Sequence, residues 1–437
     1  MARAKVAILK TSPRTVLSDY HELMNLAGYQ DVVDKKADTG LKINISWHYF
    51  FPACSTTPWQ LEGVIRAMKA DGYDPDLIHG CHNRTVVIDS HLGEVENKQL
   101  GPVLDHGLRN IHLYEGEPWI PVREAVGDLA DKFVVLNEVY PKGFSIPKRF
   151  IGENIIHLPT VKTHVFTHTT GAMKNAFGGL LNEHRHWTHP VIHETLVDLL
   201  MIQKKIHNGL FAVMDGTFAG DGPGPRCMVP HVKDVILASA DQTAIDAVAA
   251  KLMGFDPMSI KFIRMAHDMG LGVGDPREIE IVGDTVTGNE NWNFDGPYKE
   301  MTFASKNQHR IYWGPLKGPM EWSLKTWMAP WAYIASVIYH DMYWYPKNGN
   351  DRVLEALHSD WGRLFENWEK LTPDQKGWTD LGDPSDEYRH DTKALLGKGV
   401  GLVWSALKES PEVANRLRRR AQGEADDGTI PPSCSGR

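Results

Sequence analysis

The apolar and polar positions of this chain follow two alternating patterns. Short apolar or alternating runs bounded by turn residues are typical of strands, whereas runs with apolar residues every three or four positions are typical of amphipathic helices. Strands are predicted at residues 6–10, 41–47, 76–79, 85–89, 133–136, 155–158, 210–214, 235–238 and 278–282. Helices are predicted at residues 16–27, 58–73, 193–204, 243–253 and 258–269.

The ends of these helices carry matching local signals. Thr57 and Pro58 stand at the N-cap and first position of one helix, and Asp241 is placed to cap another. Strand, loop and helix repeated in this way predict an α/β fold, a sheet with helices on its faces. In such sheets ligands bind at the loops beyond the carboxyl ends of the strands.

The composition changes after about residue 290, because nine of the 14 Trp residues lie beyond residue 300. We therefore predict an α/β core at residues 1–290, a helical Trp-rich extension at 291–420 and a flexible tail at 421–437. The apolar run at 327–339 is shorter than the roughly 20 residues of a membrane-spanning helix, so no transmembrane segment is predicted. The aromatic extension either packs on the core or forms a membrane-surface helix, a substrate lid or an interface with another subunit or protein.

Charge and cysteine content exclude several classes of protein. The formal charge of −8 argues against a nucleic-acid-binding surface, and the basic run at 416–420 is typical of a solvated helix end. The four cysteines contain no CxxC pair, so neither a disulfide framework, a zinc ribbon nor an iron-sulfur cluster is expected. The N-terminal apolar run is too short for a signal peptide, and a cytoplasmic location is predicted.

Histidine is concentrated in one stretch, with seven of 21 residues between His164 and His207. Imidazole is a frequent metal ligand and proton carrier, so this density suggests a site. The spacing of His164 and His168 predicts that they share one side of a helix or strand. His193 opens a helix and His82 lies in a predicted loop, and both can supply further ligands; the alternative for each histidine is a structural hydrogen bond.

Lys174 stands in the sequence TGAMKN, where Gly171 and Ala172 leave room for a ligand near the backbone. A lysine held beside apolar groups can lose its proton and act as a nucleophile, or stay charged and bind a phosphate or carboxylate. The alternative is a surface lysine at the start of a helix.

The segment 215–226, DGTFAGDGPGPR, is predicted to be a Gly-rich turn after a strand. Backbone N–H groups between Asp215 and Gly222 can form an anion-binding nest, and Arg226 can clamp a phosphate or carboxylate; a rigid turn without a ligand is the alternative. The spacing matches neither a Walker loop nor GxGxxG. Asp246 points either to solvent or to a site.

Several of these stretches resemble the family called "domain of unknown function 362". The resemblance rests on LKINISW with TTPWQLEGVIRAMKADGY, on VKTHVFTHTTGAMKNAFGG, on DGTFAGDGPGPR and on ADQTAIDAVAAKLMGFDP, and it covers residues 4–284. Many relatives carry a ferredoxin-like module with Cys clusters that this chain lacks. The resemblance therefore implies no iron-sulfur cluster here.

A second similarity is to the nickel-pincer lactate racemases. His164 lies ten residues before Lys174, as a metal-contacting His lies before the cofactor-tethering Lys in that family, and Gly171 matches a glycine of its motif. His193 and His82 resemble two further histidines of that site. The loop expected to read Asp-x-Thr-Arg is PACSTTP here. The similarity implies a metal ion, with nickel or a nickel-pincer nucleotide as a candidate.

The leading functional hypothesis is an enzyme that moves a proton or hydride at the carbon next to a carboxylate, an isomerase or oxidoreductase acting on a small molecule. The alternatives are a non-catalytic metal- or anion-binding accessory protein, and metal-assisted hydrolysis. A homo-oligomer or a protein partner of the Trp-rich part is also compatible with the sequence. The hypothesis assigns catalysis to Lys174, His168 and Arg226, cofactor binding to Lys174, Gly171, Asn175, Asp215 and Gly222, and metal binding to His82, His164 and His193.

Overall fold

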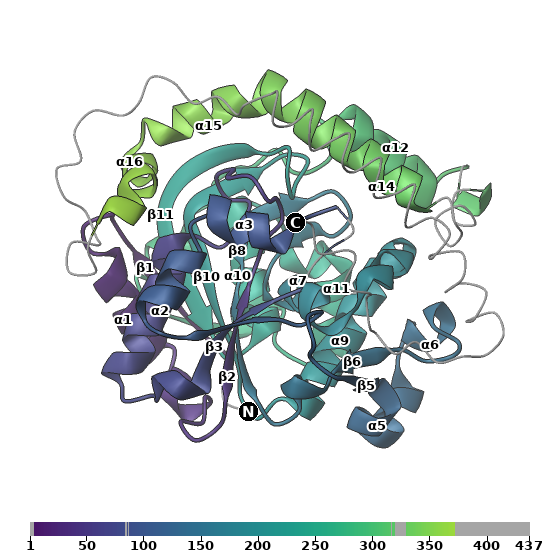
Figure 1. The fold of residues 1–437 in the computed structure, drawn as a ribbon, viewed down its shortest axis with the longest axis horizontal. Helices are drawn as coiled ribbons and strands as arrows, with labels where there is room; N and C mark the ends of the chain where they lie inside the picture. Colours follow the sequence, from purple (N-terminus) through teal and green to yellow (C-terminus); the bar gives the residue numbers. More distant parts are fainter. Residues whose placement is uncertain (1–3, 84, 86, 316, 320–328, 372–437) are drawn as a thin grey trace.

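The computed structural model describes residues 4–371 except 84, 86, 316 and 320–328. Its centre is one large mixed sheet, ordered β12-β1-β11-β10-β7-β2-β3-β4, with β8 paired to β10 and β9 (Figure 1). The strands from β10 to β4 run parallel, whereas β11 is antiparallel to both of its neighbours. The sheet strands are β1 (Ala4–Lys10), β2 (Thr39–Ile43), β3 (Ile78–His82), β4 (Arg109–His112), β7 (Asn154–Leu158), β8 (Thr160–His164), β9 (His168–Thr170), β10 (Leu210–Asp221), β11 (Val229–Ser239) and β12 (Ile279–Gly283). A separate pair is formed by β5 (Trp119–Pro121) and β6 (Ser145–Pro147).

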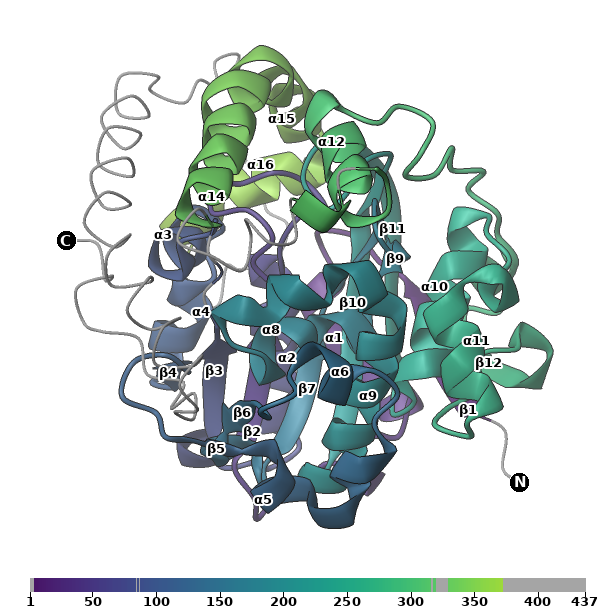
Figure 2. The ribbon, with the colours of Figure 1, turned by 90° about the vertical axis from the view of Figure 1, so that its right-hand side faces the viewer.

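Helices cover both faces of the sheet, which confirms the predicted α/β class (Figure 2). Alternate residues of a strand point to opposite faces, so Val6 and Ile8 enter one apolar core while Ala7 enters the other. The first core lies beneath α9, α10 and α11, and the second beneath α1 and α2. The helices of the core part are α1 (Val16–Leu26), α2 (Pro58–Ala70), α3 (Ser90–Glu96), α4 (Leu100–Asp105), α5 (Val122–Val126), α6 (Leu136–Val139), α7 (Ala172–Asn175), α8 (Phe177–Leu180), α9 (Ile192–Ile206), α10 (Gln242–Met253) and α11 (Lys261–Asp268).

The main helices and most strands lie where the apolar pattern predicts them, and the predicted caps form. Thr57 Oγ1 accepts a hydrogen bond from the Gln60 amide, and Asp241 accepts from the amides of Thr243 and Ala244. These side chains satisfy amides that the first helical turn leaves unpaired. The sequence therefore located these helix starts correctly.

Four predicted strands differ from the structure. The strand predicted at 76–79 begins at Ile78 and runs to His82, so His82 ends a strand and does not lie in a loop. Residues 133–136 form no strand, because the amides of Val134, Val135 and Leu136 all donate to the buried Asp198 carboxylate on α9. The strand predicted at 41–47 ends at Ile43. The described residues of 85–89 form no strand.

The Gly-rich segment predicted as a turn is in large part a strand, because β10 continues to Asp221. Its glycines allow close approach of neighbouring groups. A Cβ on Gly216 would lie 2.9 Å from the Val235 carbonyl oxygen, and one on Gly220 would lie 2.5 Å from Met228 Sδ. Only the last five residues of the segment, 222–226, leave the strand and form a turn.

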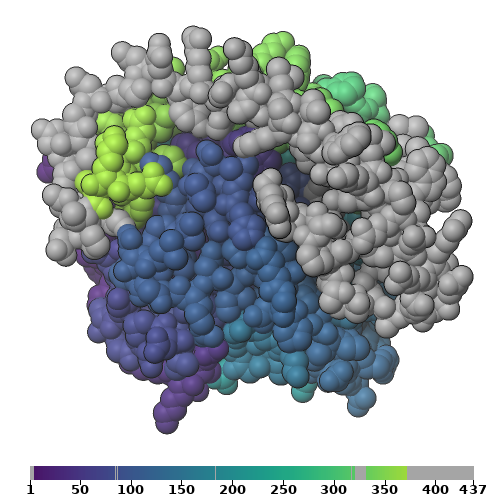
Figure 3. Space-filling model, viewed as in Figure 1, coloured from purple at the N-terminus to yellow at the C-terminus, as the bar shows by residue number. Residues whose placement is uncertain are grey.

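The described C-terminal helices form an arch over one end of the strands (Figure 1). They are α12 (Phe303–Tyr312), α14 (Ala329–Val337), a π-helix (Ile338–Gly349), α15 (Asn350–Leu357) and α16 (Asp360–Asn367). Their aromatic residues pack on the core: Phe365 stacks on Phe50 with ring centroids 3.7 Å apart, and Trp361 lies 5.1 Å from Trp59. In the space-filling view the yellow-green end of the described chain lies against the blue and purple N-terminal part (Figure 3).

Packing of the aromatic extension on the core is thus shown for its described residues. The exact division at residue 290 stays a prediction, and residues 372–437, which include the predicted tail, lie outside the described part. Within the described residues, no helix combines the length and apolar character needed to cross a membrane. The predicted cytoplasmic location stays a prediction.

Candidate functional site

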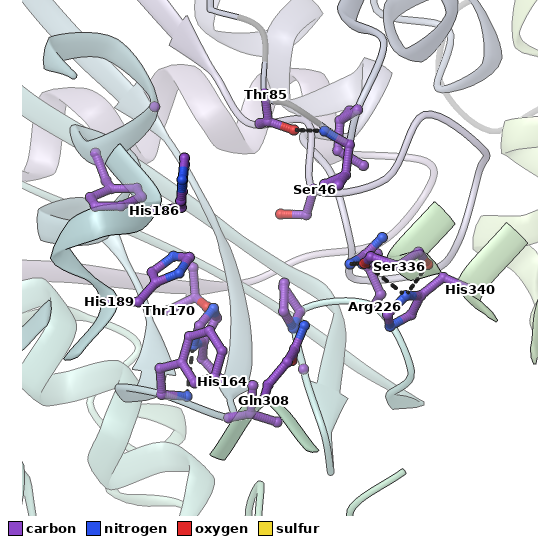
Figure 4. A pocket seen from close by; sticks show the side chains of 18 of the residues that line it. Ser46, Thr85, His164, Thr170, His186, His189, Arg226, Gln308, Ser336 and His340 are labelled. Atoms are coloured by element: carbon purple, nitrogen blue, oxygen red, sulfur yellow. Dashed lines mark hydrogen bonds between the residues drawn. The ribbon is translucent and has the colours of Figure 1, made fainter. Parts of the chain in front are cut away.

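A cavity of about 460 Å³ lies between the sheet and the C-terminal helices. Its floor is formed by residues at or just beyond the carboxyl ends of β2, β3 and β8, where α/β sheets place their ligands. Its other wall consists of residues from α12, α14 and the π-helix. Figure 4 shows side chains from both parts converging on this space.

The cavity wall is positively charged. Among its described lining residues no Asp or Glu occurs, whereas the cationic side chains are Lys42, Lys174, Arg185 and Arg226. Histidines 82, 164, 186, 189 and 340 also line the cavity, and burial lowers the pKa of His82, His164, His189 and His340, which favours their neutral form. Charges of one sign around a hollow with low-dielectric walls concentrate ligands of the opposite sign. The cavity is therefore suited to an anionic ligand.

Lys174 lines this cavity from α7, a short helix fixed by a buried carboxylate. Asp246 on α10 accepts hydrogen bonds from the amides of Ala172 (2.6 Å) and Met173 (3.1 Å). A Cβ on Gly171 would lie 2.0 Å from Asp246 Oδ1, so only glycine leaves room for this carboxylate. The sequence left the direction of Asp246 open, and the structure shows that it supports the loop that carries Lys174.

The environment of Lys174 favours its neutral form. Burial, with the charges of Lys162 and Arg185, lowers the pKa of Lys174 to about 7. The ammonium nitrogen lies 5.3 Å from the centroid of the Phe177 ring. Lys174 is thus not the solvated surface lysine that the sequence allowed as an alternative. Near pH 7 it exists in both protonation states.

The spacing of His164 and His168 predicts that they share one side of a helix or strand. This prediction is wrong, because the chain turns between them. They occupy facing positions of the β8–β9 hairpin. His164 lines the cavity, and its Nδ1 accepts a hydrogen bond from the Phe166 amide at 3.0 Å. Burial and the charge of Lys174 hold the pKa of His164 well below its usual range, so the neutral ring carries its proton on Nε2. His168 packs instead on the Phe255 ring, 4.5 Å away between centroids.

Arg226 reaches the cavity from the turn after β10. Its Nη2 donates a hydrogen bond to Ser336 Oγ at 3.3 Å, and its Nη1 is buried with no hydrogen-bond partner among the described residues. His340 Nδ1 donates to the Ser336 carbonyl oxygen at 2.7 Å (Figure 4). Burial and the charge of Arg226 lower the pKa of His340 to about 3. The Nη1 amino group, with its two N–H donors, therefore remains for a ligand.

Two imidazole–phenol contacts join the core to the C-terminal helices across the cavity. His189 Nδ1 lies 3.0 Å from Tyr312 Oη of α12, and His186 Nε2 lies 2.7 Å from Tyr333 Oη of α14. Both histidines belong to a 3-10 helix at Glu183–Val191. These contacts hold the helical wall over the cavity.

Several predicted site residues lie elsewhere. Asp215 is fully buried and accepts hydrogen bonds from Tyr20 and Trp59, so its carboxylate is committed to the core. Gly222 lies in the turn after β10, where its carbonyl oxygen accepts from Thr163, and His193 stacks on Phe262. The predicted residues that line the cavity are His82, His164, Lys174, Asn175 and Arg226. Those that do not line it are His168, Gly171, His193, Asp215 and Gly222.

The predicted metal ligands are not gathered as one set. Within the described residues, two groups of side chains bring possible ligand atoms together: His82 with Glu94 and His112, and His91 with His112 and Glu115. His164 and His193 belong to neither group. A metal set of His82, His164 and His193 stays a prediction that this geometry does not favour.

Sequence reasoning missed part of the cavity wall. Lys42 lines it from the end of β2; burial lowers its pKa to about 8, and its Nζ donates to the Ile43 carbonyl oxygen at 2.6 Å. Lys42 stands at a polar position of the alternating run LKINISW, so its residue type did not mark it as buried. Ser336 and His340 had no such signal, because their role depends on how the C-terminal helices dock.

Comparisons with known proteins agree with the main resemblance. Residues 39–251 match the family described as "Domain of unknown function (DUF362)". The thylakoid-associated protein sll1697 of Synechocystis sp. is 27% identical over 120 residues, which is 27% of this chain and 37% of that protein. The chain thus matches little more than a third of the length of this relative. No solved structure matches the chain. The similarity to nickel-pincer lactate racemases is not shown by these matches and stays a prediction.

Proposed function

We propose a function from the cavity itself, because the family that residues 39–251 match is described without an activity. The protein binds a small carboxylate-containing molecule and moves a proton at the carbon next to the carboxylate. One observation carries this proposal: the cavity is lined by basic residues without any described acidic one, and among them is a lysine with a pKa near 7.

Binding is assigned to the cationic side chains. Arg226 offers a buried Nη1 without a partner, and guanidinium groups bind carboxylates through paired N–H donors. An unpartnered buried donor costs free energy, so a ligand oxygen at this position is favoured. The volume of about 460 Å³ lies within the range of roughly 300–1,000 Å³ typical of small-molecule sites.

Proton transfer is assigned to Lys174 and His164. The neutral amine of Lys174 accepts the proton from the substrate carbon, and the cationic wall stabilises the negative charge that develops on the carboxylate oxygens. Return of the proton to either face of the carbon gives an isomerase or racemase. His164, whose free Nε2–H is available, donates to the oxygen that becomes negative.

Solvent hydrogen exchange tests this proposal directly. The protein is incubated in D₂O with small 2-hydroxy and 2-amino acids, and deuterium at the carbon next to the carboxylate is followed by NMR. We expect exchange that Lys174→Met reduces by at least about 100-fold, the usual scale of general base catalysis. Lys233→Met is the matched control: Lys233 also lies over an aromatic ring, Trp292 at 5.3 Å, and its pKa is also lowered by burial, but it does not line the cavity. Equal exchange by Lys174→Met and the wild type would contradict the role of Lys174.

The second candidate is a non-catalytic anion-binding accessory protein. It is supported by exposed aromatic residues on the C-terminal helices, among them Phe303 at 72% and Tyr343 at 51% exposed, and by the similarity to a protein named as thylakoid-associated. This candidate predicts carboxylate binding by calorimetry, reduced in Arg226→Ala, without any deuterium exchange.

The predicted attachment of a cofactor to Lys174 can be measured separately from activity. A neutral lysine amine is a nucleophile, so Lys174 is the residue to which a cofactor would attach. Intact mass spectrometry of the protein from a host that makes nickel-pincer nucleotide would show an added mass, absent in Lys174→Met. An unmodified mass in both proteins would overturn the tether.

A further inference from the structure

Two histidines stand side by side at the carboxyl ends of β3 and β4, and only one of them, His82, belongs to the metal-binding set predicted from the sequence. β3 and β4 end at His82 and His112, and the register of these parallel strands pairs the two residues directly. Their rings are stacked, with centroids 5.1 Å apart and an interplanar angle of 18°. The strand register alone therefore brings two imidazoles together.

The following helix adds a carboxylate to this pair. Asp89 caps α3 by accepting a hydrogen bond from the Leu92 amide at 3.1 Å, and α3 presents Glu94 to the two histidines. Glu94 Oε2 lies 3.2 Å from His82 Nε2 and 3.3 Å from His112 Nε2. The three residues are 2%, 3% and 9% exposed, so water is largely excluded.

These separations fit ligands of one ion. Zinc–nitrogen and zinc–oxygen bonds of about 2.0–2.1 Å in a tetrahedral site place neighbouring ligand atoms about 3.3 Å apart. The two measured separations match this value, and all three side chains offer ligand atoms within 4.8 Å of one another. Two imidazoles and one carboxylate form a ligand set that suits divalent transition metals.

The hydrogen bonding of the group is incomplete without an ion. His112 Nε2 is buried and has no hydrogen-bond partner among the described residues, although Glu94 Oε2 is only 3.3 Å away. A buried polar atom without a partner is costly. A lone pair of His112 aimed at a shared metal ion removes that cost.

We propose that His82, Glu94 and His112 bind a divalent transition-metal ion. Asn110 donates from Nδ2 to Glu94 Oε2 at 2.8 Å, and this hydrogen bond orients the carboxylate toward the two histidines. Three protein ligands leave at least one coordination position for water or an anion. His82 also lines the cavity, which places the ion at the wall of the anion site.

Metal titration of the full chain tests this site independently of any activity. The protein is freed of metal with a chelator and titrated with Co²⁺, whose visible absorption reports coordination by protein ligands, and then with Zn²⁺. We expect one Co²⁺ per chain with a d–d spectrum of four- or five-fold coordination, displaced by one Zn²⁺. Glu94→Gln and His112→Gln should weaken binding by more than 100-fold, and Asn110→Ala by about 10–100-fold.

His106→Gln is the matched control. His106 also contacts a buried glutamate, with Nε2 3.2 Å from Glu62 Oε1, but this pair has no second histidine and is not among the described groups of three possible ligands. This variant should bind Co²⁺ as the wild type does. Absence of stoichiometric Co²⁺ and Zn²⁺ binding in the wild type would overturn the proposal. So would wild-type affinity in folded Glu94→Gln or Asn110→Ala, judged by circular dichroism.

Discussion

The two walls of the cavity are built in different ways. The sheet wall carries buried cations whose positions depend on the fold of the core, such as Lys42 on β2 and Lys174 above the buried Asp246. The helical wall contributes hydroxyl groups and rings, such as Tyr312 and Ser336, which contact histidine or arginine side chains of the core. The sheet wall thus provides the buried cations, while the helical wall closes the cavity over them.

The largest effect is expected from Gly171→Ala, which disturbs the contact between Asp246 and α7 in the sheet wall. The added Cβ would lie 2.0 Å from Asp246 Oδ1 and would break the hydrogen bonds that hold α7. We expect the free energy of unfolding to fall by about 2–3 kcal/mol in urea denaturation, the scale of overpacking in a core, together with loss of carboxylate binding.

Gly101→Ala serves as the control for this substitution. Gly101 lies in α4, and a Cβ there meets no heavy atom within 4 Å. Alanine should leave stability unchanged or raise it by up to about 1 kcal/mol. Equal stabilities of the two variants would show that Asp246 does not fix α7.

An intermediate effect is expected from pH, which acts on the sheet wall alone. The pKa of Lys174 is lowered to about 7, so its amine is neutral above pH 7 and charged below it. Deuterium exchange should therefore rise through pH 7, whereas carboxylate binding should strengthen as pH falls through the same point. Parallel measurements of exchange rate and binding constant between pH 6 and 8 check this, and an exchange rate that falls with rising pH would assign the base elsewhere.

Lys174 also links stability to pH. Its folded pKa of about 7 lies below the unfolded value of about 10.4, so the unfolded chain binds the extra proton between these values. Its contribution to the free energy of unfolding should rise as pH increases from 7 to 10. Lys174→Met should remove this rise from urea denaturation curves, relative to the wild type.

The smallest effect is expected from Tyr312→Phe, which loosens the helical wall. The substitution removes the hydroxyl that lies 3.0 Å from His189 Nδ1 but keeps the ring. We expect the free energy of carboxylate binding, measured by calorimetry, to weaken by about 0.5–1.5 kcal/mol. The pH dependence of binding should stay as in the wild type. Tyr298→Phe is the control, because Tyr298 touches the His168 ring outside the cavity; weaker binding in this control would point to a general effect of hydroxyl loss.

Much of the fold could be predicted from local sequence. The helix at Pro58–Ala70 and its Thr57 cap, and the helix at Gln242–Met253 and its Asp241 cap, depend on neighbouring residues only. The error at residues 133–136 has a distant cause, because Asp198 on another helix binds three of its amides. The apolar pattern of a short segment does not reveal such a contact.

Several residues that line the cavity could be predicted from the sequence, but their positions relative to one another could not. Lys174, Arg226 and His164 do line one cavity, as their residue types in Gly-rich or His-rich stretches suggested. Asp215 stands in the same kind of stretch and is buried in the core instead, because β10 runs on through the glycines. The sequence thus pointed to several residues of the cavity wall without telling on which face of the sheet each one lies.

The sequence by itself determined the α/β class, the main helices with their caps and the presence of unusual lysine and histidine residues, since these depend on periodicity and on groups a few residues apart. Only the tertiary structure decided their partners. The register of β3 and β4 places His82 beside His112, and docking of the C-terminal helices brings Ser336 to Arg226. Such pairings join residues 30 to 110 positions apart. They follow from the packing of whole elements, which no local pattern of residues encodes.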